Sequence, residues 1–126
     1  MYQDEDALLD AIYHGDYTQA FKAMNALSHF KVPRKFTNDY QNYKHYVTIH
    51  NTLFRKEVQR ASVHPAYIDQ LSTSFTCRIE NATNKHALTK IYHDMLRKYC
   101  LVVQNNSLNG YSKIIQAALN YIVFNL

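Results

Sequence analysis

Glycine and proline are scarce in this chain, which contains only two of each among 126 residues. A β-sandwich or barrel needs a turn about every eight to twelve residues, and tight turns favour these two residue types. A bundle of long helices needs far fewer turns. The hydrophobic fraction of 47% is sufficient for a buried core, so a disordered chain is not expected. The sequence therefore predicts a globular, all-α fold.

Residues 1–30 have the pattern of a short helical hairpin. Apolar side chains recur at three- and four-residue spacing on both sides of Gly15, which is typical of amphipathic helices. Gly15 is placed to end the first helix, and Asp16 is placed to cap the second. Five acidic residues and one lysine give this segment a net charge of −4. We expect an acidic helix pair around a tight turn, with no second copy that would indicate a repeat array.

Residues 38–110 are predicted to form the central helices. A linker over residues 28–38 contains Pro33, and Asn38 at its end can cap the helix that follows. That helix has a wide apolar stripe, which predicts contacts on two sides. Pro65 suits the first position of the next helix, because that position needs no backbone N–H.

The remaining helices are expected over residues 85–104 and 111–126, with a polar loop over residues 105–110 between them. Together these segments predict one domain over residues 1–126, an irregular bundle of about six helices that begins with a hairpin. The last helix ends on the apolar run NYIVFNL without a cap or a polar tail. We therefore expect that this sequence is cut from a longer chain.

The charge of the N-terminus and the length of the apolar runs indicate where the protein is located. The N-terminus is acidic, whereas a secretory signal peptide begins with positive charge. No apolar run is long enough to cross a bilayer. A cytoplasmic protein without membrane contact is expected.

The sequence lacks the motifs that usually carry catalysis. It contains no P-loop, no dinucleotide-binding glycine pattern, no HExxH and no GxSxG. His86 and His93 are seven residues apart and can share a helix face with Asp94 beside them, but a metal site needs three or four convergent ligands and no such compact set is visible. Cys77 and Cys100 lie in apolar helical runs and are expected to be buried free thiols. We predict no enzyme activity, no cofactor and no metal.

The positive charge of the chain lies outside the N-terminal hairpin. Residues 31–126 carry 13 basic and five acidic residues, a net charge of +8. These bases occur singly or in pairs and form no continuous basic stripe, so solvated helix faces explain them better than a nucleic-acid surface does.

A set of polar residues at helix ends and turns is a candidate structural or effector-binding cluster, namely Asn51, Arg55, His64, Tyr67, Glu80 and Arg97. Asn51 and Arg55 are four residues apart, so both project from one helix face. Arg55 and Glu80 lie 10 residues before and 15 residues after Pro65, where the chain reverses. This spacing predicts similar heights on adjacent antiparallel helices, and hence an ion pair that bridges them. A structural role and an effector-binding role both stay open.

Four segments occur here in the order in which they recur in AraC-type transcription regulators of Gram-positive bacteria: NTLFRK (51–56), VHPAYID (63–69), IE (79–80) and RKYC (97–100). The chain resembles the helical region that precedes the DNA-binding domain of those regulators, over most of residues 40–126. The C-terminal segment YSKIIQAALNYIVFNL is similar to the first helix of that domain, and the acidic hairpin is similar to the helix pair that opens the region.

The resemblance implies a regulatory, dimerisation or signal-transmitting region. It implies a homodimer, and contact with promoter DNA only through a helix-turn-helix domain that this chain lacks. It also allows a small-molecule effector or a partner protein, whose identity the sequence does not reveal. Two rival hypotheses are a monomeric protein-interaction module that docks through the acidic hairpin, and a small enzyme whose site is assembled without a sequence motif.

Overall fold

The computed structural model describes residues 2–27, 39–106 and 113–125. Within these ranges the chain forms six helices and no strand, which confirms the predicted all-α bundle that opens with a hairpin. The helices are α1 (Tyr2–Tyr13), α2 (Tyr17–Leu27), α3 (Asp39–Arg60), α4 (Pro65–Asn81), α5 (Lys85–Asn106) and α6 (Lys113–Phe124). No helix in the described ranges has the length and apolarity needed to span a bilayer.

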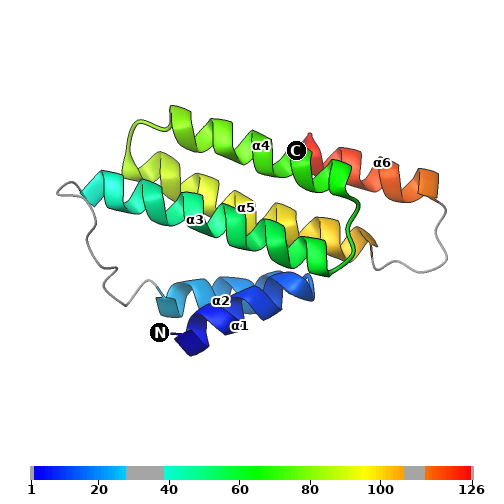
Figure 1. The fold of residues 1–126 in the computed structure, drawn as a ribbon, viewed down its shortest axis with the longest axis horizontal. Coiled ribbons are helices and arrows are strands. Elements are labelled where there is room, and N and C mark those ends of the chain that lie inside the picture. The colour runs from blue at the N-terminus through cyan, green and yellow to red at the C-terminus, as the bar shows by residue number, and fades with distance from the viewer. Residues whose placement is uncertain (1, 28–38, 107–112, 126) are drawn as a thin grey trace.

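The central layer of the molecule consists of α3, α4 and α5, each antiparallel to the helix before it (Figure 1). The α1–α2 hairpin packs against α3 and α5, on the side away from α4. Helix α6 lies along α5 and α4 at the opposite edge. The hydrophobic core lies between these layers and takes side chains from several helices, including Leu8, Ile12, Phe54, Val58, Phe75, Ile79, Leu96 and Tyr99.

The turn between α1 and α2 forms as the sequence predicts. Gly15 has a φ of 69°, and the backbone N–H groups of Gly15 and Asp16 donate to the carbonyls of Ile12 and Ala11 at 3.0 and 2.8 Å. This is the Schellman pattern that ends helices on a left-handed residue. The Asp16 carboxylate then accepts a hydrogen bond from the Gln19 N–H at 3.1 Å and caps α2.

The turn between α3 and α4 uses the same device with a different residue. Ser62 has a φ of 69°, and the Ser62 and Val63 N–H groups donate to the carbonyls of Gln59 and Val58 at 3.0 and 3.3 Å. The next helix begins at Pro65, as predicted. The chain reversal is therefore centred on Ser62, three residues before the proline.

Some predictions fall on residues that the structure does not describe. They concern the linker over residues 28–38 with its cap at Asn38, and the part of the polar loop that covers residues 107–110. The fifth helix extends to Asn106, two residues beyond its predicted end. Cys100 is buried as expected, whereas Cys77 is exposed, because its position on α4 points away from the core.

Candidate functional site

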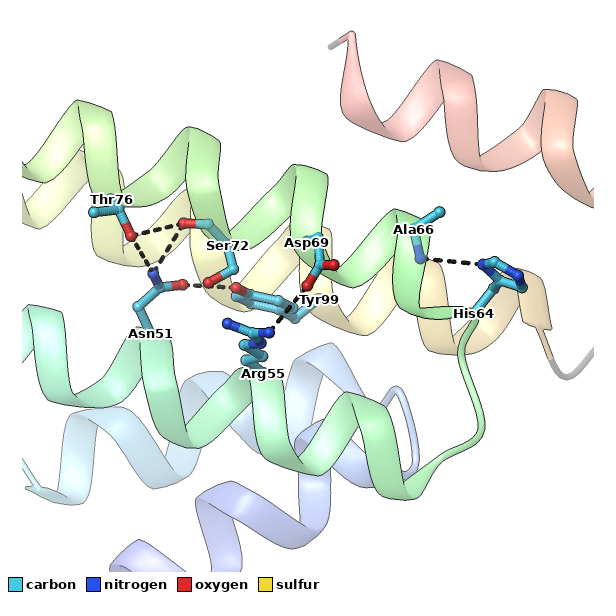
Figure 2. A network of polar contacts seen from close by, with 8 residues as sticks. All are labelled: Asn51, Arg55, His64, Ala66, Asp69, Ser72, Thr76 and Tyr99. Atoms are coloured by element: carbon cyan, nitrogen blue, oxygen red, sulfur yellow. Dashed lines mark hydrogen bonds and ion pairs between the residues drawn. The ribbon is translucent and has the colours of Figure 1, made fainter.

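Asn51 of α3 is a buried polar residue between the central helices, with an exposed fraction of 4%. Its Nδ2 donates hydrogen bonds to the Ser72 carbonyl at 3.2 Å and to Thr76 Oγ1 at 3.3 Å, both on α4. Its Oδ1 accepts a hydrogen bond from the Tyr99 hydroxyl of α5 at 2.6 Å (Figure 2). Thr76 Oγ1 donates to the Ser72 carbonyl at 2.8 Å. Asn51 thus joins all three central helices, and its amide oxygen and nitrogen both have partners.

Arg55 lies one turn beyond Asn51 on the same face of α3, as its spacing predicts, and also reaches α4 (Figure 2). Its Nη2 lies 3.0 Å from Asp69 Oδ1, and the two side chains are 49% and 62% exposed. The predicted partner was Glu80, and that prediction is wrong. Arg55 and Asp69 pair at the solvent-exposed rim of the α3–α4 interface.

The register of the hairpin explains this correction. Arg55 and Asp69 lie seven residues before and seven residues after Ser62. Lys44 and Glu80 each lie 18 residues from Ser62, and the Lys44 Nζ donates to the Glu80 carbonyl at 3.4 Å. Counting from Pro65 instead of Ser62 moves the residue level with Arg55 by six positions, from Asp69 to Phe75, and the unequal spacings of 10 and 15 residues add the other five. Glu80 is 11 residues beyond Asp69, which is about 16 Å at a rise of about 1.5 Å per residue.

His64 caps the start of α4, away from the Asn51 network (Figure 2), and Tyr67 lies in the first turn of that helix. The Ala66 N–H donates to His64 Nδ1 at 3.1 Å, so the imidazole caps the helix. The Tyr67 ring contacts the His64 ring edge-on, with centroids 6.0 Å apart. Both residues therefore have a local structural role at this helix terminus.

Arg97 belongs to a separate ionic cluster on α5. Its Nη2 lies 2.9 Å from Asp94 Oδ1, while Arg78 Nη1 of α4 and the buried Lys98 Nζ lie 2.6 and 3.7 Å from Asp94 Oδ2. Partial burial raises the pKa of Asp94, but hydrogen bonds from Arg78 and Arg97 outweigh this effect and lower it overall. The six predicted residues thus do not form one site. Asn51 and Arg55 share one part of the α3–α4 interface, Glu80 lies at the far end of α4, and the remaining three lie elsewhere.

A second buried polar group lies between α3 and α5. His50 has an exposed fraction of 4%, and its Nδ1 is hydrogen-bonded to the Tyr92 hydroxyl. The ring of Tyr46 lies 4.1 Å from the imidazole, centroid to centroid. Burial lowers the pKa of His50 to about 4, so the neutral imidazole is the stable form. The sequence signal was its place within the apolar stripe of α3, but nothing in the sequence identified the tyrosine partner.

These groups are better suited to holding helices together than to chemistry. Burial raises the pKa of the Cys100 thiol to about 12, which keeps it protonated and poorly nucleophilic. In the described ranges, no three His, Cys, Asp or Glu side chains gather closely enough to hold a metal ion. Asn51 and His50 both have interhelical partners, and satisfied buried hydrogen bonds of this kind fix the register of packed helices.

Comparison with known proteins gives no match, whether with protein families, with characterised proteins or with solved structures.

Proposed function

We propose that this chain is the regulatory region of an AraC-type transcription factor, and that it dimerises and transmits a signal without reading DNA itself. The motifs at residues 51–56, 63–69 and 97–100 carry the resemblance on which the proposal rests. In this account the operator is read by a helix-turn-helix domain beyond this chain, and α6 is the helix that leads to it.

The single observation that best supports the proposal is the outer surface of α6. Ile115, Tyr121 and Ile122 are 45%, 69% and 56% exposed, although α6 is the most apolar helix of the described chain by sequence. Large apolar side chains gathered on one helix are typical of surfaces that contact another protein or domain. Helix α6 packs on the bundle along one side and exposes apolar side chains on another. Such a helix is suited to binding a second copy of the chain and to transmitting a signal to a following domain.

Sedimentation equilibrium across a concentration series tests the dimerisation part of this proposal. The chain has a monomer mass of 14.8 kDa, and we expect it to approach twice that mass as its concentration rises. Ile122→Glu places a charge in the apolar surface and should give a monomer. The matched control is Ile49→Glu, because Ile49 of α3 is also an exposed isoleucine, with an exposed fraction of 40%. A wild-type chain that stays monomeric throughout contradicts dimerisation.

The alternative, a monomeric interaction module, is favoured by the charge of α1. Asp6 and Asp10 are exposed on this helix, and Asp4 and Glu5 are partly exposed. Such a module would remain monomeric in the same experiment, and its partner would carry a basic surface. The double variant Asp6→Asn, Asp10→Asn removes both charges. It should then bind the partner more weakly, and its sedimentation behaviour should be unchanged.

A further inference from the structure

The last turn of α5 contacts three other parts of the molecule through three consecutive side chains. Gln104 Nε2 donates to the Gly15 carbonyl in the α1–α2 turn at 2.7 Å. Asn105 Nδ2 donates to Asn120 Oδ1 of α6 at 3.1 Å. Asn106 Nδ2 lies 3.3 Å from the carbonyls of Ala61 and Ser62 in the α3–α4 turn. We call Gln104, Asn105 and Asn106 the α5 junction. It lies at the end of the bundle where both turns are found (Figure 1).

The contact with the α1–α2 turn is tight. A Cβ atom placed on Gly15 would lie 3.0 Å from the Cys100 carbonyl oxygen and 3.2 Å from Gln104 Cγ. The backbone of the turn therefore lies directly on α5, and only glycine combines this approach with a φ of 69°. The α1–α2 turn is thus held against the last two turns of α5.

Few of the described side chains of α6 are buried in its contact with α5 and α4. Among the side chains of α6 that the structure describes, Asn120 and Val123 are the buried ones, each with an exposed fraction of 4%. Separation of α6 from α5 would expose the amides of Asn105 and Asn120, and water can replace the hydrogen bond between them. Elements held by few buried apolar groups open at low free energy. The described contacts of α6 therefore suit a helix that can separate from the bundle and return to it.

The contact with the α3–α4 turn satisfies backbone groups. The carbonyls of Ala61 and Ser62 follow the end of α3, where helices leave acceptors without partners in the same helix. Asn106 supplies donors to both. All three contacts require that the last turn of α5 stays helical, because a change in its backbone would move the three side chains together.

We propose that the α5 junction couples the docking of α6 to the position of the acidic α1–α2 hairpin. A partner or ligand that displaces the hairpin would weaken the last turn of α5 and release α6, and binding of α6 elsewhere would loosen the hairpin. Coupling between two sites is reciprocal by thermodynamic necessity. This inference adds a structural route to the proposed transmission of a signal, and it rests on that proposed function for what the coupling would transmit.

Amide hydrogen exchange of the full chain, read by mass spectrometry, tests the coupling in both directions. Gln104→Ala removes the contact with Gly15, and exchange in α6 over residues 118–124 should rise by at least about fivefold. Asn120→Ala removes the contact on α6, and exchange around Gly15 should rise by a similar factor. The matched control is Asn81→Ala. In the described structure the Asn81 side-chain amide donates to the Cys77 carbonyl at 2.9 Å, within the same helix.

Exchange at Phe75 in the middle of α4 serves as an internal reference, and it should not change in any variant. If Gln104→Ala alters exchange only at Gly15, and Asn120→Ala only in α6, the coupling does not exist. Because the experiment uses neither DNA nor a partner, this result would overturn the coupling while leaving dimerisation to be judged by sedimentation.

Discussion

Tyr99 of α5 donates its hydroxyl hydrogen to Asn51 Oδ1 of α3 at 2.6 Å, in the buried centre of the bundle. Because Asn51 also donates to Ser72 and Thr76 of α4, one asparagine links three helices. If one of these hydrogen bonds were lost, the buried amide of Asn51 would keep an unpaired polar atom. Such an atom is costly, because neither water nor another donor can replace the missing partner. The register of the three central helices thus depends on a polar contact that hydrophobic packing alone would not specify.

Tyr99→Phe should lower the free energy of unfolding by about 1–3 kcal/mol, because it leaves Asn51 Oδ1 buried without its donor. Urea denaturation followed by far-UV circular dichroism measures this loss. Tyr67→Phe is the matched control, since Tyr67 is half-buried and contacts His64 through its ring. If both variants lose the same stability, the Tyr99 hydroxyl has no special role.

Arg55→Ala should cost less than about 1 kcal/mol, because the ion pair with Asp69 is exposed to water. A double-mutant cycle should give a small coupling free energy between Arg55 and Asp69 and none between Arg55 and Glu80. A larger coupling with Glu80 than with Asp69 would show that the register of the α3–α4 hairpin differs from the one described.

Acid should destabilise the fold through His50. Its pKa is lowered from 6.5 to about 4 in the folded chain, so folding favours the neutral imidazole. This contribution is complete above about pH 6.5 and is lost as the pH falls toward 4, by an amount on the order of 3 kcal/mol. His50→Gln should flatten the loss of stability between pH 7 and pH 4, measured by urea denaturation at each pH. His86→Gln, at an exposed position on α5, should leave the wild-type profile unchanged.

The two left-handed turn residues should respond in opposite directions. Ser62 has a φ of 69°, which is unfavourable for a residue with a Cβ, so Ser62→Gly should stabilise the fold by up to about 1 kcal/mol. Gly15→Ala introduces both that strain and a close approach to α5, and should destabilise by more than about 1 kcal/mol. Thermal denaturation of the two variants measures both effects. Equal melting temperatures would contradict the left-handed backbone conformation described for Ser62 and Gly15.

The fold could be predicted from the sequence because its signals are local. The three- and four-residue spacing of apolar side chains indicated the helices, and Gly15 and Pro65 marked two of their boundaries. The partner of Arg55 could not be predicted in the same way. It depends on where the chain reverses, and a serine in the left-handed region at position 62 gives no sequence signal.

The polar contacts were harder to predict than the helices. Asn51 was identified as a candidate, but its burial against Tyr99 depends on how three helices meet, and not on the spacing within one. The position of Asp94 beside His93 indicates at most a metal ligand, whereas in the structure its carboxylate pairs with Arg78 and Arg97. Cys77 is predicted to be buried but is exposed, because it lies two positions from both Phe75 and Ile79 and therefore on the opposite face of α4 from these buried residues.

The central claim is that this chain dimerises and transmits a signal without reading DNA sequence itself. Its binding to DNA tests this claim most directly. Selection of duplexes from a random library by the purified chain, followed by anisotropy titration, reports both sequence preference and salt dependence. We predict no enriched sequence, and only weak binding that disappears as salt is raised from roughly 50 to 200 mM, as expected of phosphate contacts alone. Enrichment of one sequence motif, bound by the chain through that range of salt, would contradict the account.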